Sequence, residues 1–154
     1  PVSDFAERVI LEAKKKLDTV KSEEEYETCD IYGYVDYYFD PIQYKTNIED
    51  KSFDIIRCRN VIHHIQDLDK LSVEFSRILK DGGILEITEP KKEYYNANYY
   101  LDYLWYRFVI PRYEVWFSKK YRDCKDYFKE FELGYYDTLD EKELFIFIKK
   151  MDTV

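Results

Sequence analysis

Glycine and proline are scarce in this sequence, with four copies of each among 154 residues, and no Gly-x-Gly pattern occurs. Cysteine is also rare. Its three copies, Cys29, Cys58 and Cys124, are odd in number and far apart, without a Cys-x-x-Cys pair. This usage excludes a disulfide framework and a zinc site, and it predicts reduced thiols in a cytoplasmic compartment.

The chain lacks an excess of positive charge, because its formal net charge is −8. Phosphate binding needs clustered Lys and Arg, so a broad nucleic-acid surface is excluded, although a local basic patch is not. No signal peptide is visible, and a membrane-spanning helix is ruled out because the most apolar window, 101–117, is interrupted by Asp102, Arg107, Pro111, Arg112 and Glu114. The chain begins at Pro1 without a methionine, as in a processed product or a piece of a longer protein.

The composition that is present favours one globular domain. Hydrophobic residues make up 45% and charged residues 36% of the chain, which is typical of a soluble folded protein and not of a disordered one. The length is enough for one domain with a core and too short for two, so we expect a single domain over residues 1–154.

One stretch of three predicted elements organises the rest of the chain. Residues 53–58 (FDIIRC) form a short apolar run, as expected of a parallel strand. Residues 66–80 place an apolar stripe at helical spacing. Asp81-Gly82-Gly83 is expected to stop this helix through a left-handed glycine, and residues 84–88 (ILEIT) to form a second strand. Strand, helix and strand in close succession predict a crossover unit of a parallel sheet.

These residues resemble a known family. The segments FDIIRCRNVIHHI, SRILKDGG and ILEITEP are similar to the fourth strand, following helix and fifth strand of class I S-adenosylmethionine (SAM)-dependent methyltransferases. The helix of that family commonly ends in Arg-x-Leu-Lys-Pro-Gly-Gly, and Asp81 stands here where proline is usual. The resemblance implies an α/β, Rossmann-like methyltransferase fold. Its sheet would be mainly parallel, with helices on both faces and an antiparallel pair of strands at the C-terminus.

The start of the chain bears on the cofactor. Residues 1–17 are predicted to form a helix with Ser3 or Asp4 as its cap and Glu7 three positions after Asp4. In the resembling family, the first strand and a glycine-rich loop that cradles the methionine end of SAM come immediately before such a helix. Either the chain begins just after that loop, and lacks the first strand, or the loop has been lost.

The next predicted strand, 25–31, carries a candidate ribose ligand. Asp30 lies near its end, where the resemblance implies a carboxylate that accepts both ribose hydroxyls of SAM. The alternative is that Asp30 merely ends a strand, and Asp36 and Asp40 are rivals for the role. Residues 32–38 are expected to form a strand or a short helix, followed by a turn at Asp40-Pro41.

Residues 47–52 resemble the adenine-contacting loop of the family. There Ile48 would pack on the adenine ring and Asn47 would read its amino edge. A polar surface turn is the alternative reading of this segment.

Cys58, Arg59 and Asn60 come at the carboxyl end of the central strand, where open α/β sheets place their ligands. The resemblance implies that residues here contact the methionyl part of SAM. Asn60 would hydrogen-bond its amino acid group and Arg59 would pair with its carboxylate. Cap and surface roles are the alternatives.

His63 and His64 are the only histidines of the chain and stand side by side. A neutral imidazole can take a proton from an acceptor hydroxyl or amine, so both are candidate catalytic bases. Adjacent side chains on a helical turn diverge by about 100°, so at most one should face the pocket. A structural role is the alternative for at least one. No further His or Cys lies at metal-ligand spacing, and no metal site is expected.

Glu89 and Lys91-Lys92 follow the second strand at the same edge of the sheet. A carboxylate there could orient the acceptor, but a solvated turn is the favoured reading.

Residues 94–122 form an aromatic-rich segment after the fifth strand, where the family places variable, substrate-facing parts. A few of these aromatic side chains are expected to form a lid or an acceptor pocket. For most of them the favoured reading is a helix that packs on the sheet or contacts a partner chain, as in a homodimer through 94–121.

The end of the chain predicts a closing strand pair. Residues 127–136 and 143–149 are expected to be strands joined by 137–142, and they resemble the sixth and seventh strands of the same fold. The continuous apolar run 144–148 predicts that the last strand is buried on both faces.

The resemblance implies SAM-dependent methyl transfer to a small-molecule or RNA acceptor that enters beside His63. Methyl transfer works mainly by positioning, so the lack of an obvious nucleophile does not count against it. The Lys-Asp-Lys-Glu set typical of ribose 2′-O-methyltransferases is not satisfied. The alternative is a degenerate methyltransferase fold that acts as a scaffold or partner-binding subunit.

Overall fold

The computed structural model describes residues 26–30, 34–95, 101, 104–105, 118 and 120–151. The predicted helix 1–17 and most of the aromatic segment 94–122 lie outside these residues. Among the described residues, no helix is long and apolar enough to cross a bilayer. The elements follow the order β1 (Cys29–Asp30), β2 (Tyr37–Asp40), β3 (Lys45–Thr46), β4 (Phe53–Arg59), η1 (Ile62–His64), α2 (Leu68–Ile78), β5 (Leu79–Pro90), η2 (Lys92–Tyr94), η4 (Cys124–Asp126), β6 (Phe131–Leu139) and β7 (Lys142–Lys149).

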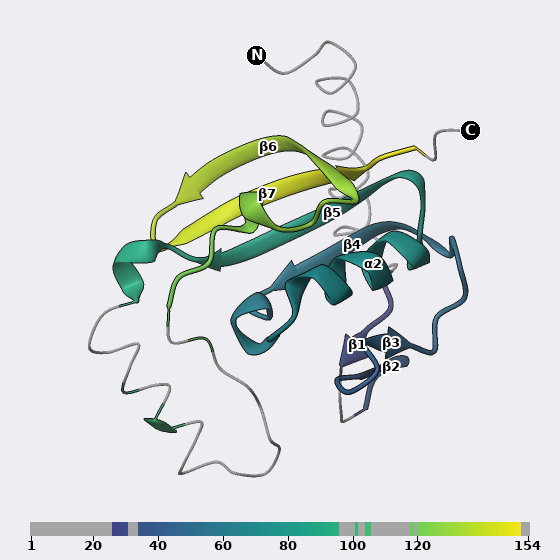
Figure 1. Cartoon of the computed structure of the whole chain (residues 1–154), viewed down its shortest axis with the longest axis horizontal. Helices are drawn as coiled ribbons and strands as arrows, with labels where there is room; N and C mark the ends of the chain where they lie inside the picture. The colour runs from purple at the N-terminus through teal and green to yellow at the C-terminus, as the bar shows by residue number, and fades with distance from the viewer. Residues whose placement is uncertain are drawn as a thin grey trace.

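The predicted strand–helix–strand unit is confirmed as β4, α2 and β5. Strands β4 and β5 pair in parallel, with Ile56 opposite Leu85 and Cys58 opposite Ile87. Helix α2 begins after Asp67, whose side chain accepts a hydrogen bond from the backbone N–H of Lys70. Figure 1 shows α2 lying across β4 and β5, and its apolar stripe buries against them.

The expectation that Gly82 and Gly83 stop the helix is wrong. The helix ends at Ile78, and the chain passes directly into β5 at Leu79. The two glycines lie instead in a bulge of β5, where the register against β4 shifts. Gly82 adopts a φ of +71°, and a Cβ on Gly83 would lie 2.7 Å from the carbonyl oxygen of Lys80. Glycine is therefore required by the bulge and not by a helix cap.

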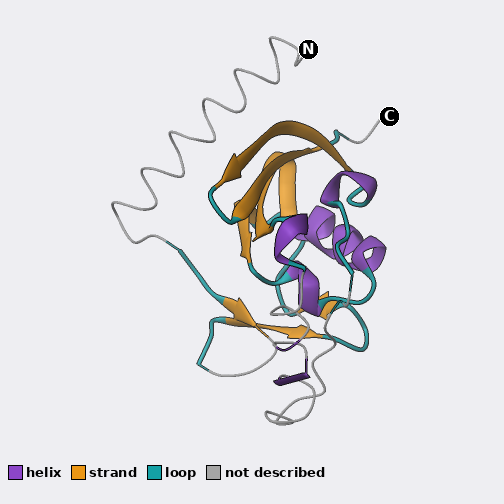
Figure 2. Ribbon diagram, turned by 90° about the vertical axis from the view of Figure 1, so that its left-hand side faces the viewer, coloured by secondary structure: helices purple, strands orange, loops and turns teal. Residues whose placement is uncertain are grey.

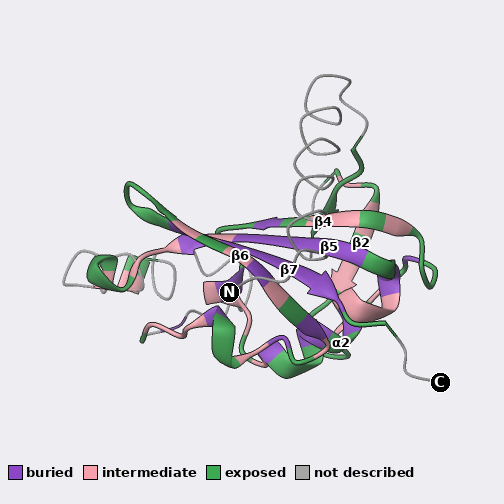
Figure 3. Ribbon diagram, turned by 90° about the horizontal axis from the view of Figure 1, so that it is seen from above, coloured by how far each residue is buried: buried purple, intermediate pink, exposed green. Residues whose placement is uncertain are grey.

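The closing strand pair is confirmed with a shorter turn than expected, because β6 runs from Phe131 to Leu139 instead of over 127–136, and β7 begins one residue early at Lys142. Strand β7 pairs antiparallel with both β5 and β6, and only Asp140 and Glu141 remain outside the strands of the hairpin. Residues 145–149 are all buried, as the apolar run predicts. Figure 3 shows that burial is concentrated in the two central strands β5 and β7.

The order of the four-stranded sheet is β4-β5-β7-β6, with one parallel pair and two antiparallel pairs. One face packs on α2 through a core of leucine, isoleucine and phenylalanine side chains, and Figure 2 shows the helical elements on that side. The opposite face carries a smaller cluster of Ile84, Ile146 and Ile148. Among the elements of the described residues, α2 is the one α-helix, so the mainly parallel sheet with helices on both faces stays a prediction.

A separate three-stranded sheet, β1-β2-β3, holds the residues before the central strand. Here the sequence was less informative: β1 covers two residues, and β2 begins at Tyr37 instead of near residue 32. The predicted turn at Asp40-Pro41 is confirmed, because the Asp40 carboxylate accepts from the backbone N–H of Ile42 at 2.8 Å and of Gln43 at 3.1 Å.

Candidate functional site

The carboxyl end of β4 is built around Asn60. Its backbone N–H donates to the carbonyl oxygen of Thr88 at 2.9 Å, so it extends the pairing of β4 with β5 by one residue. Its φ of 56° is left-handed, a conformation that asparagine tolerates better than most residues. The chain reverses there and enters the short helix η1. This reversal places the side chains of η1 over the ends of β4 and β5.

Cys58 and Arg59, the two residues before Asn60, lie on opposite faces of the sheet. Cys58 is buried on the α2 side, and burial, followed by the charge of Glu89, raises the pKa of its thiol. The thiol is therefore neutral and is no nucleophile. Arg59 is exposed, and its guanidinium lies 3.9 Å from Glu86, which also accepts a hydrogen bond from Arg57 at 3.2 Å.

Glu89 is the central polar group of this strand end. It is 4% exposed, on the same inward side of β5 as Leu85 and Ile87. One carboxylate oxygen accepts from the backbone N–H of Ile62 at 2.6 Å, and the other lies 2.7 Å from Nδ1 of His63. The favoured sequence reading of a solvated turn is therefore wrong for Glu89. The alternation Leu85, Ile87, Glu89 was the signal that could have identified it as inward-facing.

The two histidines do not diverge as expected. Their ring centroids are 4.3 Å apart with an interplanar angle of 49°, so the two rings lie against each other although adjacent side chains leave a 3-10 turn about 120° apart. The His63 side chain is 10% exposed. The imidazole of His63 therefore lies beside Glu89, and the ring of His64 packs against that of His63.

A second buried carboxylate lies beside Glu89 on the neighbouring strand β7. Glu143, the first buried residue of β7, is the register partner of Glu89. It accepts hydrogen bonds from the hydroxyls of Tyr121 at 2.5 Å and Tyr136 at 2.7 Å. The hydrogen bond to Glu143 raises the pKa of Tyr136 to about 12, and burial followed by the same carboxylate raises the pKa of Tyr121.

The turn that carries His63 is also held from the other side. Arg122 donates to the carbonyl oxygens of Ile62 at 2.8 Å and Ile65 at 2.7 Å, and the backbone N–H of Ser118 donates to the carbonyl oxygen of His63 at 2.8 Å. No pattern in the sequence indicated Arg122, because it pairs with backbone atoms more than fifty positions earlier. Residues at the end of the aromatic-rich segment 94–122 thus fix the position of η1.

The remaining predicted cofactor residues lie elsewhere. Ile48 is 7% exposed and Asn47 accepts a hydrogen bond from the backbone N–H of Tyr38 at 2.8 Å; both precede the start of β4. Asp30 is exposed on β1 in the small sheet. The structure therefore brings together Cys58, Arg59, Asn60, His63 and His64 at the end of β4, and it leaves Asp30, Asn47 and Ile48 outside this group.

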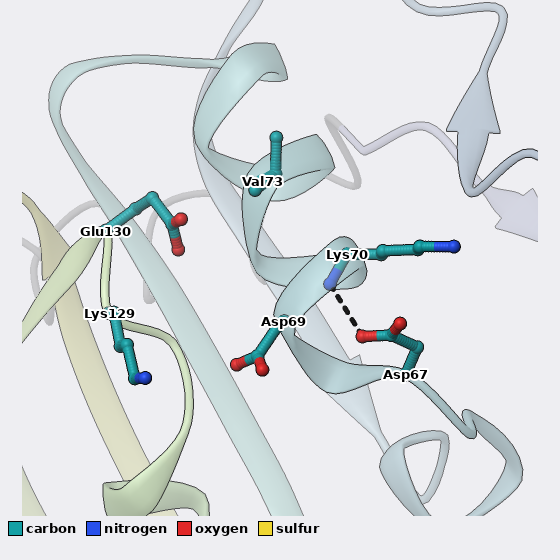
Figure 4. A pocket seen from close by; sticks show the side chains of 6 residues that line it. All are labelled: Asp67, Asp69, Lys70, Val73, Lys129 and Glu130. Carbon is teal, nitrogen blue, oxygen red and sulfur yellow. Dashed lines mark hydrogen bonds between the residues drawn. The ribbon is translucent and has the colours of Figure 1, made fainter.

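A pocket of about 290 Å³ lies at a different place, between the start of α2 and the segment before β6. It is lined by Asp67, Asp69, Lys70, Val73, Lys129 and Glu130 (Figure 4). None of the predicted site residues lines it. Among the described residues, no group of three or more His, Cys, Asp or Glu could hold a metal ion.

The parallel β4–α2–β5 unit, with polar residues at the carboxyl ends of its strands, is the arrangement of an α/β protein that binds its ligand at that edge. Comparison with known proteins identifies the family. The model of the "Methyltransferase domain" family matches residues 6–131, most of the chain, and the chain belongs to this family. No curated protein matches the sequence.

Three solved structures are similar. A candidate type 11 methyltransferase from Sulfolobus solfataricus is 22% identical over 73% of this chain and 57% of its own, with a TM-score of 0.49. A SAM-dependent methyltransferase from Methanosarcina mazei is 18% identical over 75% and 66%, with a TM-score of 0.50. A protein from Pyrococcus horikoshii OT3 is 16% identical over 89% and 68%, with a TM-score of 0.51.

The similarity to the Methanosarcina and Pyrococcus structures supports an α/β methyltransferase fold. The chain spans less than two thirds of the length of the Sulfolobus and Methanosarcina proteins.

Proposed function

We propose that the protein is a SAM-dependent methyltransferase acting on a small-molecule or RNA acceptor in the cytoplasm. The observation that carries the proposal is the end of β4, where Arg59 and Asn60 are exposed beside His63 at the ligand-binding edge of a methyltransferase fold. Family membership over residues 6–131 supports it.

The residues present at this edge fit the amino acid end of SAM. Arg59 offers guanidinium donors for a carboxylate, and Asn60 offers both a donor and an acceptor. The neutral thiol of Cys58 would neither compete as a nucleophile nor repel the bound group. The roles of Asp30, Asn47 and Ile48 toward the nucleoside stay predictions.

When bound, SAM supplies a methyl group on a positively charged sulfur. The part of this chain would be to align an acceptor with that group and to exclude water, which can account for most of the rate enhancement. We place the acceptor beside His63 and His64, with His63 as the base that takes a proton from it. The aromatic segment 94–122 is proposed as the lid or acceptor pocket.

Calorimetric titration with S-adenosylhomocysteine tests the proposal. We expect binding in the micromolar range, about −8 kcal/mol. The variant Asn60→Gly removes the side-chain amide and keeps the left-handed backbone, and it should weaken binding by about tenfold. Asp69→Asn, in the pocket of Figure 4, is the matched control and should bind as the unaltered chain does. No heat of binding would contradict the proposal and favour a scaffold without catalysis.

A further inference from the structure

The contacts of Glu89 determine which ring nitrogen of His63 carries the hydrogen. A carboxylate has only acceptors, and here one oxygen accepts from the backbone N–H of Ile62 while the other lies 2.7 Å from Nδ1 of His63. Both distances are short, at or just below the lower end of the range for charge-assisted N–H···O hydrogen bonds. The hydrogen between Glu89 and His63 therefore belongs to Nδ1. In a neutral imidazole this leaves the lone pair on Nε2, which becomes the nitrogen that can accept a proton.

We propose that Glu89 is a positioning residue that holds His63 in the Nδ1–H tautomer, so that Nε2 acts as the catalytic base. The inference rests on the proposed methyl transfer and narrows the acceptor to a group that carries a removable hydrogen, a hydroxyl or an N–H. The oxygen or nitrogen of the acceptor forms a bond to the methyl carbon, and the carbon–sulfur bond breaks with its electron pair going to sulfur. The hydrogen of the acceptor moves to Nε2, and Glu89 stabilises the resulting imidazolium.

The surroundings of His63 make this geometry rigid. Arg122 and Ser118 hold the carbonyl oxygens of Ile62 and His63, so the turn is fixed independently of the side chain of Glu89. The imidazole of His64, with its ring centroid 4.3 Å away, packs against His63 and restricts its rotation. A base that is fixed in both tautomer and orientation needs no reorganisation at the moment of proton transfer.

Glu143 provides a matched comparison within the same sheet. It is the register partner of Glu89, it is also buried, and it also accepts two hydrogen bonds. Its donors are the phenols Tyr121 and Tyr136 and not an imidazole. A Glu143→Gln substitution therefore changes the charge of the cluster about as much as Glu89→Gln does, without touching the contact that sets the tautomer.

The test is the ¹⁵N spectrum of the imidazoles at about pH 8, where an ordinary imidazole is neutral. The chain has two histidines, and His64→Gln assigns the signals of His63. We expect the hydrogen of His63 on Nδ1 in the unaltered chain. In Glu89→Gln the amide carbonyl keeps the Ile62 contact and the amide hydrogens face Nδ1, so the hydrogen should move to Nε2. Glu143→Gln should leave it on Nδ1.

Two results would overturn the inference whether or not S-adenosylhomocysteine binds. One is that Nε2 of His63 carries the hydrogen in the unaltered chain. The other is that Glu143→Gln moves the hydrogen to Nε2 as much as Glu89→Gln does. The hydrogen on Nδ1 without any binding would instead overturn the proposed function, and the base role with it, while the tautomer assignment stands. Once an acceptor is identified, Glu89→Gln should lower kcat by about 100-fold with little change in KM.

Discussion

The four-stranded sheet and the three-stranded sheet are stabilised by different kinds of contact. The large sheet is buried: Leu85 and Ile87 are fully enclosed between β4, β7 and α2. The small sheet is mostly exposed, although Phe39 and the nearby Tyr44 pack against the apolar core. Polar contacts also attach it: the buried carboxylate of Glu74 on α2 accepts from the backbone N–H and the hydroxyl of Thr46 on β3. Arg77 completes this attachment with hydrogen bonds to Glu74 and Asp50.

This difference indicates which contacts stabilise each part of the fold. Apolar burial stabilises the large sheet, and it also supports the strand ends where the candidate site lies. The small sheet also depends on the charged cluster of Glu74 and Arg77 on α2, so substitutions in that cluster should weaken the small sheet and leave the large sheet intact.

The largest expected effect comes from the core of the large sheet. Leu85→Ala should lower the free energy of unfolding by about 3 kcal/mol, because it removes a fully buried side chain and leaves a cavity. Ile42→Ala, at a site 87% exposed next to the small sheet, should change it by less than about 0.5 kcal/mol. Denaturant unfolding measures both. Equal changes in the free energy of unfolding for the two variants would contradict the difference between the two regions.

Loss of the polar contacts that attach the small sheet should have an intermediate effect on the free energy of unfolding. Arg77→Ala leaves the Glu74 carboxylate buried without its strongest donor and should cost roughly 2 kcal/mol. Lys80→Ala removes an ion pair to Asp54 in which both side chains are exposed, and it should cost less than about 0.5 kcal/mol.

Hydrogen exchange of the amides of β2 and β3 locates the loss caused by Arg77→Ala. Faster exchange in β2 and β3 with unchanged exchange in β5 and β7 is the expected result. Uniform loss of protection across both sheets would contradict the separation of the two regions.

The smallest effect is a change in the pH dependence of stability. Burial raises the pKa of Glu74, but the hydrogen bonds from Arg77 and Thr46 outweigh it, and the net pKa is lowered from 4.5. A carboxyl group whose pKa is lower in the folded chain stabilises it above the unfolded pKa, and this stabilisation is lost as the pH falls.

The free energy of unfolding should therefore decrease more steeply in the unaltered chain than in Glu74→Gln as the pH is lowered from 4.5 to about 3. Urea unfolding at a series of pH values measures the two slopes. Identical slopes would show that Glu74 does not contribute to the acid sensitivity of the chain.

The same contrast explains how far the sequence could predict the fold. The β4–α2–β5 unit and the β6–β7 pair follow from apolar runs and helical spacing, because burial leaves a periodic trace in the sequence. The small sheet leaves little trace, since its strands are short and exposed and depend on distant partners such as Glu74. The role of Gly82 and Gly83 was misread because a helix stop and a strand bulge both use glycine.

The candidate site was predicted in part for a similar reason. The position of Asn60 and His63 at a strand end could be predicted because they follow a recognisable strand, and the inward direction of Glu89 could have been predicted from its alternation with Leu85 and Ile87. Their roles toward a ligand stay predictions. Arg122 could not be predicted, because its partners are backbone oxygens far away in the sequence. Local pattern thus indicates which strand ends carry polar groups, but not which distant side chains hold them in place.

The most direct test of the account is to locate the site where S-adenosylhomocysteine binds, by recording the backbone amide signals of the chain during a titration. The account predicts that the largest shifts fall on Arg59, Asn60 and the η1 turn, at the carboxyl end of β4. Saturable binding with its largest shifts on α2 and the residues around Lys129, and none at the end of β4, would contradict it.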